Sequence, residues 1–373
     1  MSKRIRVGVL FGGRSGEHEV SLASARSVMS ALDREKYEVL PIGITRSGEW
    51  VHDEPMKQLT TSVQDQPYLL ESGKESAHIQ DSQEMTVASR APLSTFDSSL
   101  PDVVFPVLHG PFGEDGTIQG LLEIAGLPYV GCGVAGSAVG MDKILMKGMF
   151  ATVGLPQLPY VSLTRYEWER KPSRVLDRIE AGLRYPIFVK PANLGSSVGI
   201  SKVRTREELR KALNFAASYD RRLVVEQGLE RPREIEVAIL GNDEPVASIA
   251  GEISPNDEYE FYDYESKYSE GQAKLMIPAP ISEEQLLSIQ EMAIGAFQAV
   301  DGAGLSRVDF LMDRETGEIY LNELNSMPGF TATSMYPKLW EATGLPYPQL
   351  LQKLIDLGLE RYGEQNRNRQ DKY

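Results

Sequence analysis

The chain has 373 residues, which at roughly 100–200 residues per domain predicts two or three domains. Hydrophobic residues make up 41% of the chain and charged residues 25%, as in ordinary globular proteins. The 53 acidic residues outnumber the 39 basic ones, so the net charge of −14 argues against nucleic acid as the main partner. The single cysteine, Cys132, excludes an intramolecular disulfide framework and is typical of a reducing compartment.

Neither a secretion signal nor a membrane span is expected. Arg6 interrupts the first apolar run, where a signal peptide would need an unbroken core. Ile124 to Met141 is uncharged, but its glycines, its proline and its few large aliphatic side chains match a spanning helix poorly. We therefore expect a cytoplasmic protein without a membrane partner.

The first part of the chain is expected to form an α/β domain over residues 1–140. Ile5 to Leu10 is typical of a buried strand, and Tyr37 to Ile44 of a second one. Between them, apolar residues at steps of three, four and three mark one helix face: Leu22, Ala25, Met29 and Leu32. Strand, helix and strand at this spacing predict a βαβ unit and a parallel sheet. Residues 52–100 are polar and aperiodic, which favours a variable surface insertion.

Residues 141–230 show a different pattern and are expected to form a central domain. The strand Ile187 to Lys190 is followed by a loop rich in glycine and serine and then by a second strand, Gly199 to Val203. A further strand is predicted from Leu223 to Gln227. Strands joined by so short a connection pair antiparallel, because a parallel crossover needs a dozen or more residues.

Residues 231–373 are expected to form a C-terminal domain with another antiparallel sheet. Apolar and polar residues alternate over 235–239, as in a half-buried strand. Two more strands, over 306–312 and 318–324, flank a turn and predict a hairpin. Residues 363–373 are charged and lack an apolar period, so we expect this end to fray.

The strongest chemical signal is in that hairpin. Asp309 and Glu323 are each seven residues from Thr316, so a symmetric hairpin places them opposite each other, and Asn325 shares the face of Glu323. Carboxylates that face each other across a ladder repel unless a cation lies between them. Two carboxylates and an amide suit Mg²⁺, which also takes oxygens from phosphates. The alternative is an exposed acidic face with a shifted register.

A second signal is the loop from Lys190 to Gly199. Its glycines let backbone N–H groups approach an anion, its serines add donors, and Lys190 supplies charge. The alternative is a flexible hairpin tip. Beside a Mg²⁺ site the phosphate interpretation is favoured, and the two signals together indicate a nucleoside triphosphate.

Two further clusters follow strands of the first domain, where α/β sheets bind ligands. Glu17 could bind a substrate ammonium, or it could simply be a favourable acid at a helix start. His109 could contact a substrate, or it could be a structural histidine.

In order and spacing, the motifs from Val7 to Leu357 resemble those of the D-alanine–D-alanine ligases, which belong to the ATP-grasp superfamily. The matching positions are Gly12-Gly13-x-Ser15-x-Glu17-x-Glu19-Val20-Ser21, His109-Gly110, Gly113-Glu114-Asp115-Gly116, Met141-Asp142-Lys143, Lys190 to Gly199, Glu226, Glu234, Tyr262-Asp263-Tyr264-Glu265-x-Lys267-Tyr268, Arg307-x-Asp309 and Glu323-x-Asn325-x-x-Pro328-Gly329.

The resemblance implies an N-terminal domain followed by two ATP-grasp subdomains, 141–230 and 231–373, whose antiparallel sheets enclose ATP. It also implies that two D-alanines are joined through a D-alanyl phosphate, giving ADP and phosphate for peptidoglycan precursors. A homodimer is expected, together with a mobile loop, 259–274, that closes over the site.

The resemblance assigns roles residue by residue. Nucleotide contacts are implied for Lys143, Lys190, Ser196, Ser197, Glu226, Gln227, Leu229, Glu234, Lys267 and Asn322. Two Mg²⁺ ions, with Mn²⁺ as an alternative, would be held by Asp309, Glu323 and Asn325. Catalytic roles fall to Glu17, Ser196, Tyr268, Arg307 and Gly329, and the substrates would be bound by Glu17, His109 and Ser334.

The sequence disfavours two alternative functions. A ligase for another pair, such as D-alanine and D-lactate, is disfavoured by Tyr268, because lactate-using relatives tend to carry phenylalanine there. A nucleotide-binding regulator without catalysis would be expected to lack Arg307 or a metal ligand, and this sequence has them all.

Overall fold

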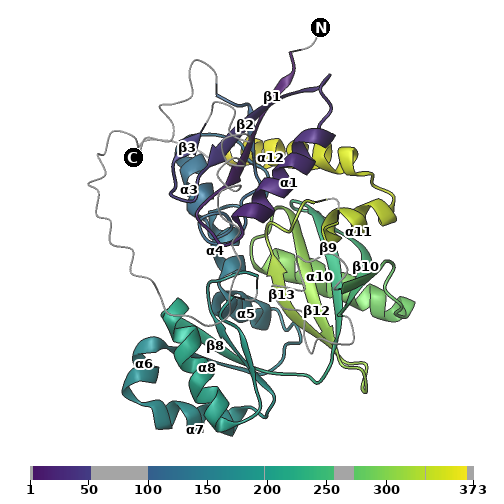
Figure 1. Cartoon of the computed structure of the whole chain (residues 1–373). Coiled ribbons are helices and arrows are strands. Elements are labelled where there is room, and N and C mark those ends of the chain that lie inside the picture. The colour runs from purple at the N-terminus through teal and green to yellow at the C-terminus, as the bar shows by residue number, and fades with distance from the viewer. Residues whose placement is uncertain (1–2, 52–99, 197, 256–272, 332, 368–373) are drawn as a thin grey trace, which may run out of the picture.

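The structure is a computed structural model that describes residues 3–51, 100–196, 198–255, 273–331 and 333–367. Three sheets form its framework: a four-stranded sheet β3-β2-β1-β4, a four-stranded sheet β5-β8-β6-β7 and a five-stranded sheet β11-β10-β9-β12-β13 (Figure 1). The mixed α/β class predicted from the sequence is confirmed.

The N-terminal sheet is parallel apart from its edge strand. Strand β1 lies between β2 and β4 and runs parallel to both, while the short β3 pairs antiparallel with β2. Val7 and Val9 of β1 are buried on the side of α1, and Leu10 is buried with α3, so both faces of the sheet are covered, as parallel sheets require. The elements are β1 (Ile5–Gly12), α1 (His18–Ala31), β2 (Tyr37–Ile44), β3 (Trp50–Val51), β4 (Val103–Pro106), α3 (Thr117–Ile124) and α4 (Val134–Met141).

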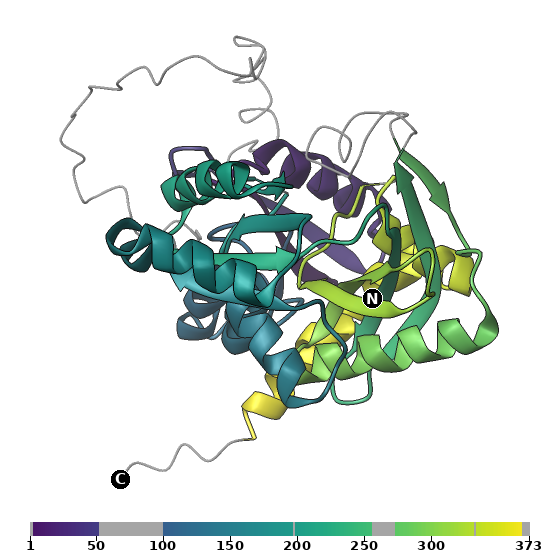
Figure 2. The ribbon, with the colours of Figure 1, turned by 90° about the horizontal axis from the view of Figure 1, so that it is seen from below.

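The central sheet is antiparallel throughout. Ile187 and Val189 of β6 are buried against α7 and α8, and because side chains alternate along a strand, Phe188 and Lys190 point to the opposite face. The elements are α5 (Lys143–Thr152), β5 (Tyr160–Thr164), α6 (Arg165–Arg170), α7 (Pro172–Gly182), β6 (Ile187–Pro191), β7 (Ser201–Val203), α8 (Arg206–Tyr219) and β8 (Arg222–Gln227). Figure 2 shows this sheet beside the C-terminal sheet, with α6–α8 on its outer side.

The C-terminal sheet is antiparallel as well. Ile235 and Val237 of β9 pack under α10, whereas Ala238 and Leu240 on the opposite face belong to the core formed with α11 and α12. That opposite face is acidic toward the start of β9, at Glu236. The elements are β9 (Arg233–Gly241), β10 (Val246–Pro255), β11 (Ala273–Met276), α10 (Glu283–Ala299), β12 (Gly304–Met312), β13 (Ile319–Asn325), α11 (Met335–Thr343) and α12 (Tyr347–Gln365).

The last helix returns to the first domain. Leu350 and Leu354 of α12 are fully buried in one core with Val9 of β1 and Phe105 of β4. Figure 1 shows α12 beside α1 and the N-terminal strands. The sequence had grouped this helix with the C-terminal sheet, and its packing ties the two parts of the chain together.

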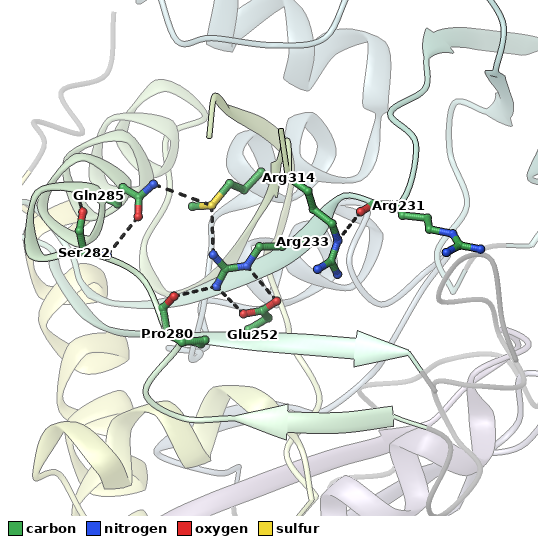
Figure 3. A network of polar contacts seen from close by, with 8 residues as sticks. Arg231, Arg233, Glu252, Pro280, Ser282, Gln285 and Arg314 are labelled. Atoms are coloured by element: carbon green, nitrogen blue, oxygen red, sulfur yellow. Dashed lines mark hydrogen bonds and ion pairs between the residues drawn. The ribbon is translucent and has the colours of Figure 1, made fainter. Parts of the chain in front are cut away.

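A polar network secures the acidic end of β9 (Figure 3). Arg233 donates from Nε and Nη2 to the carboxylate of Glu252 on β10, at 3.0 and 2.6 Å, and from Nη2 to the carbonyl of Pro280 at 3.0 Å. Nearby, Arg314 donates from Nε to the carbonyl of Arg231 at 2.6 Å. Charge-assisted bonds of this bidentate kind are geometrically specific, so they fix the strand end that carries Glu234.

Candidate active site

Three carboxylates form a row across the C-terminal sheet. Asp309 of β12 is paired with Glu236 of β9 on one side and with Glu323 of β13 on the other. The pairing of Asp309 with Glu323 confirms the hairpin prediction. It depends on a shift of register between Asp309 and Phe310, which leaves Asn322 as an extra residue in β13.

Arg307 partly neutralises this row. Its Nε and Nη2 donate to the two carboxylate oxygens of Asp309, each at 2.7 Å, and its Nε lies 3.0 Å from Oε2 of Glu236. Asn325, opposite Arg307 on β13, donates from Nδ2 to Asp309 at 3.0 Å. Burial works against the cation, but Asp309 and Glu236 raise the pKa of Arg307 well above its ordinary value. The guanidinium therefore remains charged at any physiological pH.

The side of the central sheet that faces this acidic row carries charges in the reverse order, with one carboxylate between two cations. Glu226 of β8 lies between two ammonium groups, with Lys147 Nζ 3.0 Å from Oε1 and Lys190 Nζ 2.5 Å from Oε2. All three side chains are largely or wholly buried. Burial opposes ionisation of Glu226, yet the two lysines lower its pKa to about 2. The cluster therefore carries a net positive charge.

The two clusters act on each other. Burial tends to lower the pKa of Lys190, but Glu226, Glu323 and Glu234 together raise it. Glu323 and Glu234 belong to the C-terminal sheet, so the positive cluster of one sheet faces the negative cluster of the other. Between them, an anionic ligand and a cation would each find groups of opposite charge.

The loop after β6 is anchored at its base. Lys143 Nζ donates to the carbonyl of Leu194 at 2.6 Å, and its backbone N–H donates to Ala192 at 3.0 Å. The side chain of Asp220 accepts from the backbone N–H of Asn193 at 2.9 Å. This anchoring argues against the alternative of a loose hairpin tip.

The tip of that loop reaches the N-terminal domain. The hydroxyl of Ser196, a residue with a left-handed backbone (φ 49°), donates to the carboxylate of Glu17 at the start of α1. A Cβ atom at Gly110 would lie 2.5 Å from Glu17 Oε2, and one at Gly195 would lie 2.9 Å from it. Both glycines therefore let the backbone pass close to this carboxylate. The hydrogen bond brings together Glu17 and Ser196, two predicted catalytic residues that are 179 positions apart in the sequence.

His109 and Glu114 support the segment that follows β13. The ring nitrogens of His109 lie 3.2 Å from Ser24 Oγ and 3.1 Å from the carbonyl of Met327. Glu114 accepts from the backbone N–H of Gly110 at 2.7 Å and of Met327 at 3.1 Å. Burial and the charge of Glu17 raise the pKa of Glu114 to about 8, against these two donors. Both ring nitrogens of His109 thus contact protein atoms, which favours a supporting role for this residue.

Gly329 and Ser334 lie next to each other. A Cβ atom at Gly329 would come within 2.8 Å of Ser334 Oγ, so a side chain at this position would displace the Ser334 hydroxyl. The hydroxyl of Ser334 accepts from the backbone N–H of Thr331 at 3.0 Å, at the start of α11. Its position is therefore set by the turn that leads into the helix.

Two of the predicted nucleotide contacts, Gln227 and Leu229, lie at the end of β8 and just beyond it. Gln227 uses its carboxamide within the protein: Nε2 donates to the carbonyl of Arg184 at 2.6 Å and Oε1 accepts from the N–H of Arg184 at 2.7 Å. Leu229 is half-buried just beyond the strand. A nucleotide contact from Gln227 would therefore have to come from its backbone.

Some predicted residues lie outside the described ranges, namely Ser197, Lys267 and Tyr268. The predicted mobile loop 259–274 lies mostly outside them too. Its last two residues, Ala273 and Lys274, belong to strand β11, where Lys274 pairs with Ser254 of β10. The alternation of polar and apolar residues there is too short to be recognised as a strand without its partner.

Three site residues were missed by the sequence prediction: Lys147, Glu236 and Glu114. A signal existed for two of them. Lys147 is one helical turn after Lys143, and Glu236 alternates with buried residues of β9. Neither signal shows which strand or helix lies opposite, so neither residue could be assigned a partner.

Within the described residues, no group of three or more His, Cys, Asp or Glu side chains is arranged to hold a metal ion. A metal at the acidic row would therefore use two carboxylates, the amide of Asn325 and oxygens from a ligand. Over the same residues, no helix combines the length and apolar character needed to cross a membrane.

Known proteins share this architecture. The family model for the D-ala D-ala ligase N-terminus matches residues 6–132, and the model for the D-ala D-ala ligase C-terminus matches residues 149–356. The solved D-alanine–D-alanine ligase of Coxiella burnetii superposes with a TM-score of 0.77 at 36% identity, covering 98% of this chain and 97% of the other. The VanG D-Ala:D-Ser ligase of Enterococcus faecalis also gives 0.77 and 36%, covering 95% and 100%. The fold is thus of the ATP-grasp type.

Relatives by sequence are more similar still. The D-alanine–D-alanine ligase of Heliobacterium modesticaldum is 54% identical over 97% of this chain and 96% of its own, and that of Geobacillus thermodenitrificans is 52% identical over 97% of each. The chain belongs to the D-alanine–D-alanine ligase family.

Proposed function

We propose that the protein joins two D-alanines at the expense of ATP, giving D-alanyl-D-alanine, ADP and phosphate. The observation that carries the proposal is the pair of facing charge clusters, Glu226 between two lysines and Arg307 between two carboxylates. A triphosphate with its cations complements both. Membership of the D-alanine–D-alanine ligase family indicates that the two molecules joined are D-alanines.

The nucleotide would lie between the two sheets. Lys143, Lys190 and the Ser196–Ser197 loop would contact the phosphates, together with Lys267. The end of β8, Glu226 to Leu229, would line the adenine, Glu234 would bind the ribose, and Asn322 would lie near the phosphates. The anchoring of Lys143 to Leu194 supports this arrangement, because it keeps the loop and the lysine together.

Asp309, Glu323 and Asn325 would hold two Mg²⁺ ions, or Mn²⁺ in their place. Their oxygens are hard ligands of the kind that these ions prefer. When bound, the ions supply neutralisation of phosphate charge. Arg307, which occupies both oxygens of Asp309 here, would then release part of that carboxylate.

The reaction has two steps. A carboxylate oxygen of the first D-alanine attacks the γ-phosphorus of ATP and ADP leaves, a step that needs mainly positioning and charge neutralisation. The amine of the second D-alanine then attacks the carbonyl carbon of the acyl phosphate, and phosphate leaves. Arg307 and the backbone N–H of Gly329 would stabilise the oxyanion formed on the way, and one such donor is typically worth ~3 kcal/mol.

The N-terminal domain would bind the substrates. Glu17 would hold the ammonium of the first D-alanine, and Ser334 the carboxylate of the second, with His109 nearby. Ser196 and Tyr268 would help to remove the proton of the attacking amine. The hydrogen bond from Ser196 to Glu17 supports the involvement of Ser196 in this proton removal.

The product would serve peptidoglycan synthesis in the cytoplasm, which agrees with the lone Cys132, and the protein would act as a homodimer. Sedimentation of the purified protein tests the assembly directly, and a monomer at micromolar concentration would contradict it.

The decisive test is phosphate release with ATP and D-alanine, compared with L-alanine, D-lactate and D-serine as the second substrate. We expect D-alanyl-D-alanine as the main product. Preference for D-lactate or D-serine in a mixture would establish the alternative pair instead. Hydrolysis of ATP without any dipeptide would contradict the ligase function.

A further inference from the structure

The segment Ser326–Phe330, the first part of the connection from β13 to α11, is held by groups from the N-terminal domain. Ser24 of α1 is fully buried, and its hydroxyl accepts a hydrogen bond from the backbone N–H of Phe330 at 3.3 Å. The same hydroxyl lies 3.2 Å from Nε2 of His109, whose Nδ1 lies 3.1 Å from the carbonyl of Met327. Ser24 thus reaches the segment at two points.

The direction of these hydrogen bonds follows from the chemistry of their groups. A carbonyl oxygen can only accept, so Nδ1 of His109 carries the proton that it shares with Met327. In a neutral imidazole Nε2 is then the acceptor, and the hydroxyl of Ser24 donates to it. Burial lowers the pKa of His109 despite the opposing influence of Glu17, which agrees with a neutral ring.

Two more contacts hold the same segment. The hydroxyl of Tyr347, at the start of α12, donates to the carbonyl of Phe330 at 3.0 Å. Glu114 accepts from the backbone N–H of Met327 at 3.1 Å. Both backbone groups of Phe330 and both of Met327 are therefore fixed, and Gly329 lies between these residues.

We infer that Ser24 is a positioning residue for the ligation: it holds the N–H of Phe330 directly and the carbonyl of Met327 through His109, and so keeps the N–H of Gly329 aimed at the reacting carbonyl. The inference rests on the proposed function, in which Gly329 is an oxyanion donor. A misplacement of about 1 Å can cost about a hundredfold in rate. Because ATP binds elsewhere, the loss should appear in kcat and not in the KM for ATP.

The test compares Ser24→Ala with Ser30→Ala. Ser30 is exposed on the same helix, and its hydroxyl donates to the carbonyl of Ser27 at 2.9 Å. In Ser24→Ala we expect kcat to fall about ten- to a hundredfold, with the KM for ATP as in the parent and the thermal midpoint lowered by only about 2–4 °C, because two buried polar groups lose their partner. Ser30→Ala should match the parent in all three. A parental kcat in Ser24→Ala overturns the inference, as does a fall in kcat matched by a rise in the KM for ATP.

Two further variants test the relay, meaning the hydrogen bonds from Ser24 to His109 and from His109 to Met327. They distinguish its loss from a non-specific loss of structure. His109→Asn keeps a nitrogen donor near Met327 but offers no ring acceptor to Ser24, so Ser24→Ala should cost less in that background than in the parent. Equal costs overturn the relay. Tyr347→Phe removes a single hydroxyl that holds Phe330 from α12, and it should show the same loss confined to kcat; a parental kcat there overturns the anchoring of Phe330. A parent enzyme that forms no dipeptide at all contradicts the proposed function, and that result is known before any variant is made.

Discussion

The central sheet and the C-terminal sheet carry buried charge clusters of opposite sign. On the central sheet one carboxylate, Glu226, lies between two ammonium groups, Lys147 and Lys190. On the C-terminal sheet one guanidinium, Arg307, lies between two carboxylates, Asp309 and Glu236.

The difference shows how a buried site can retain charge for a ligand. A buried ion without a partner is very costly, so each cluster contains a counter-ion. Neither cluster is fully neutralised, because Glu226 lies between two lysines and Arg307 lies in a row of three carboxylates. The remaining charge is positive where phosphates are proposed to bind and negative where metal ions are proposed to bind.

The largest expected effect is on the acidic side. Glu323→Gln and Asp309→Asn should each reduce turnover by about a thousandfold while the fold is retained, because several kcal/mol of phosphate charge neutralisation is lost with the metal. Phosphate release measured across a Mg²⁺ titration checks this. Glu318→Gln, an exposed residue just before the same strand, is the matched control and should remain active. Near-parental turnover of Glu323→Gln at low Mg²⁺ would falsify the metal assignment.

On the central side, Glu226→Gln should lower stability most. It removes the anion between two buried cations, and breaking such a cluster typically costs about 3–5 kcal/mol. Urea unfolding of the parent and the variant measures the difference. Glu207→Gln removes an exposed partner of Lys211 on α8 and should leave the unfolding midpoint unchanged. If both variants behave alike, Glu226 is not the counter-ion that the geometry indicates.

The same carboxylate predicts a dependence on pH. The pKa of Glu226 is about 2 in the folded protein, below its ordinary value of 4.5. Its stabilising contribution is therefore complete above pH 4.5 and is lost as the pH falls toward 2, and it amounts to about 3 kcal/mol. The stability gap between the parent and Glu226→Gln should shrink between about pH 6 and about pH 3. A gap that stays constant over this range would show that the pKa is not depressed.

A smaller effect distinguishes the two lysines. Lys147 is more deeply buried than Lys190, with 2% against 12% of the side chain exposed. Lys147→Met should cost about 1–3 kcal/mol in stability, as the loss of a charged hydrogen-bond partner does, and it should leave the KM for ATP unchanged. Lys190→Met should raise that KM. Equal effects of both variants on ATP would mean that Lys147 also faces the ligand.

Much of the site could be predicted from the sequence, because its signals are local. The spacing of Asp309 and Glu323 about one turn predicted their pairing, and alternation predicted that Asn325 would share a face with Glu323. The order of motifs identified the family. Residues assigned by that resemblance, such as Gly329 and Ser334, also lie together in the structure.

Other features depended on contacts between distant parts of the chain. Glu236 joins the acidic row because β9 lies beside β12, although about seventy residues separate them in sequence. Lys147 meets Glu226, and Ser24 meets Phe330, through packing of separate elements. Periodicity shows which side of a strand or helix is buried, but it does not identify the element that covers that side. For this protein, local pattern determined the strands, the hairpin and the family, whereas long-range packing alone decided which charges became neighbours.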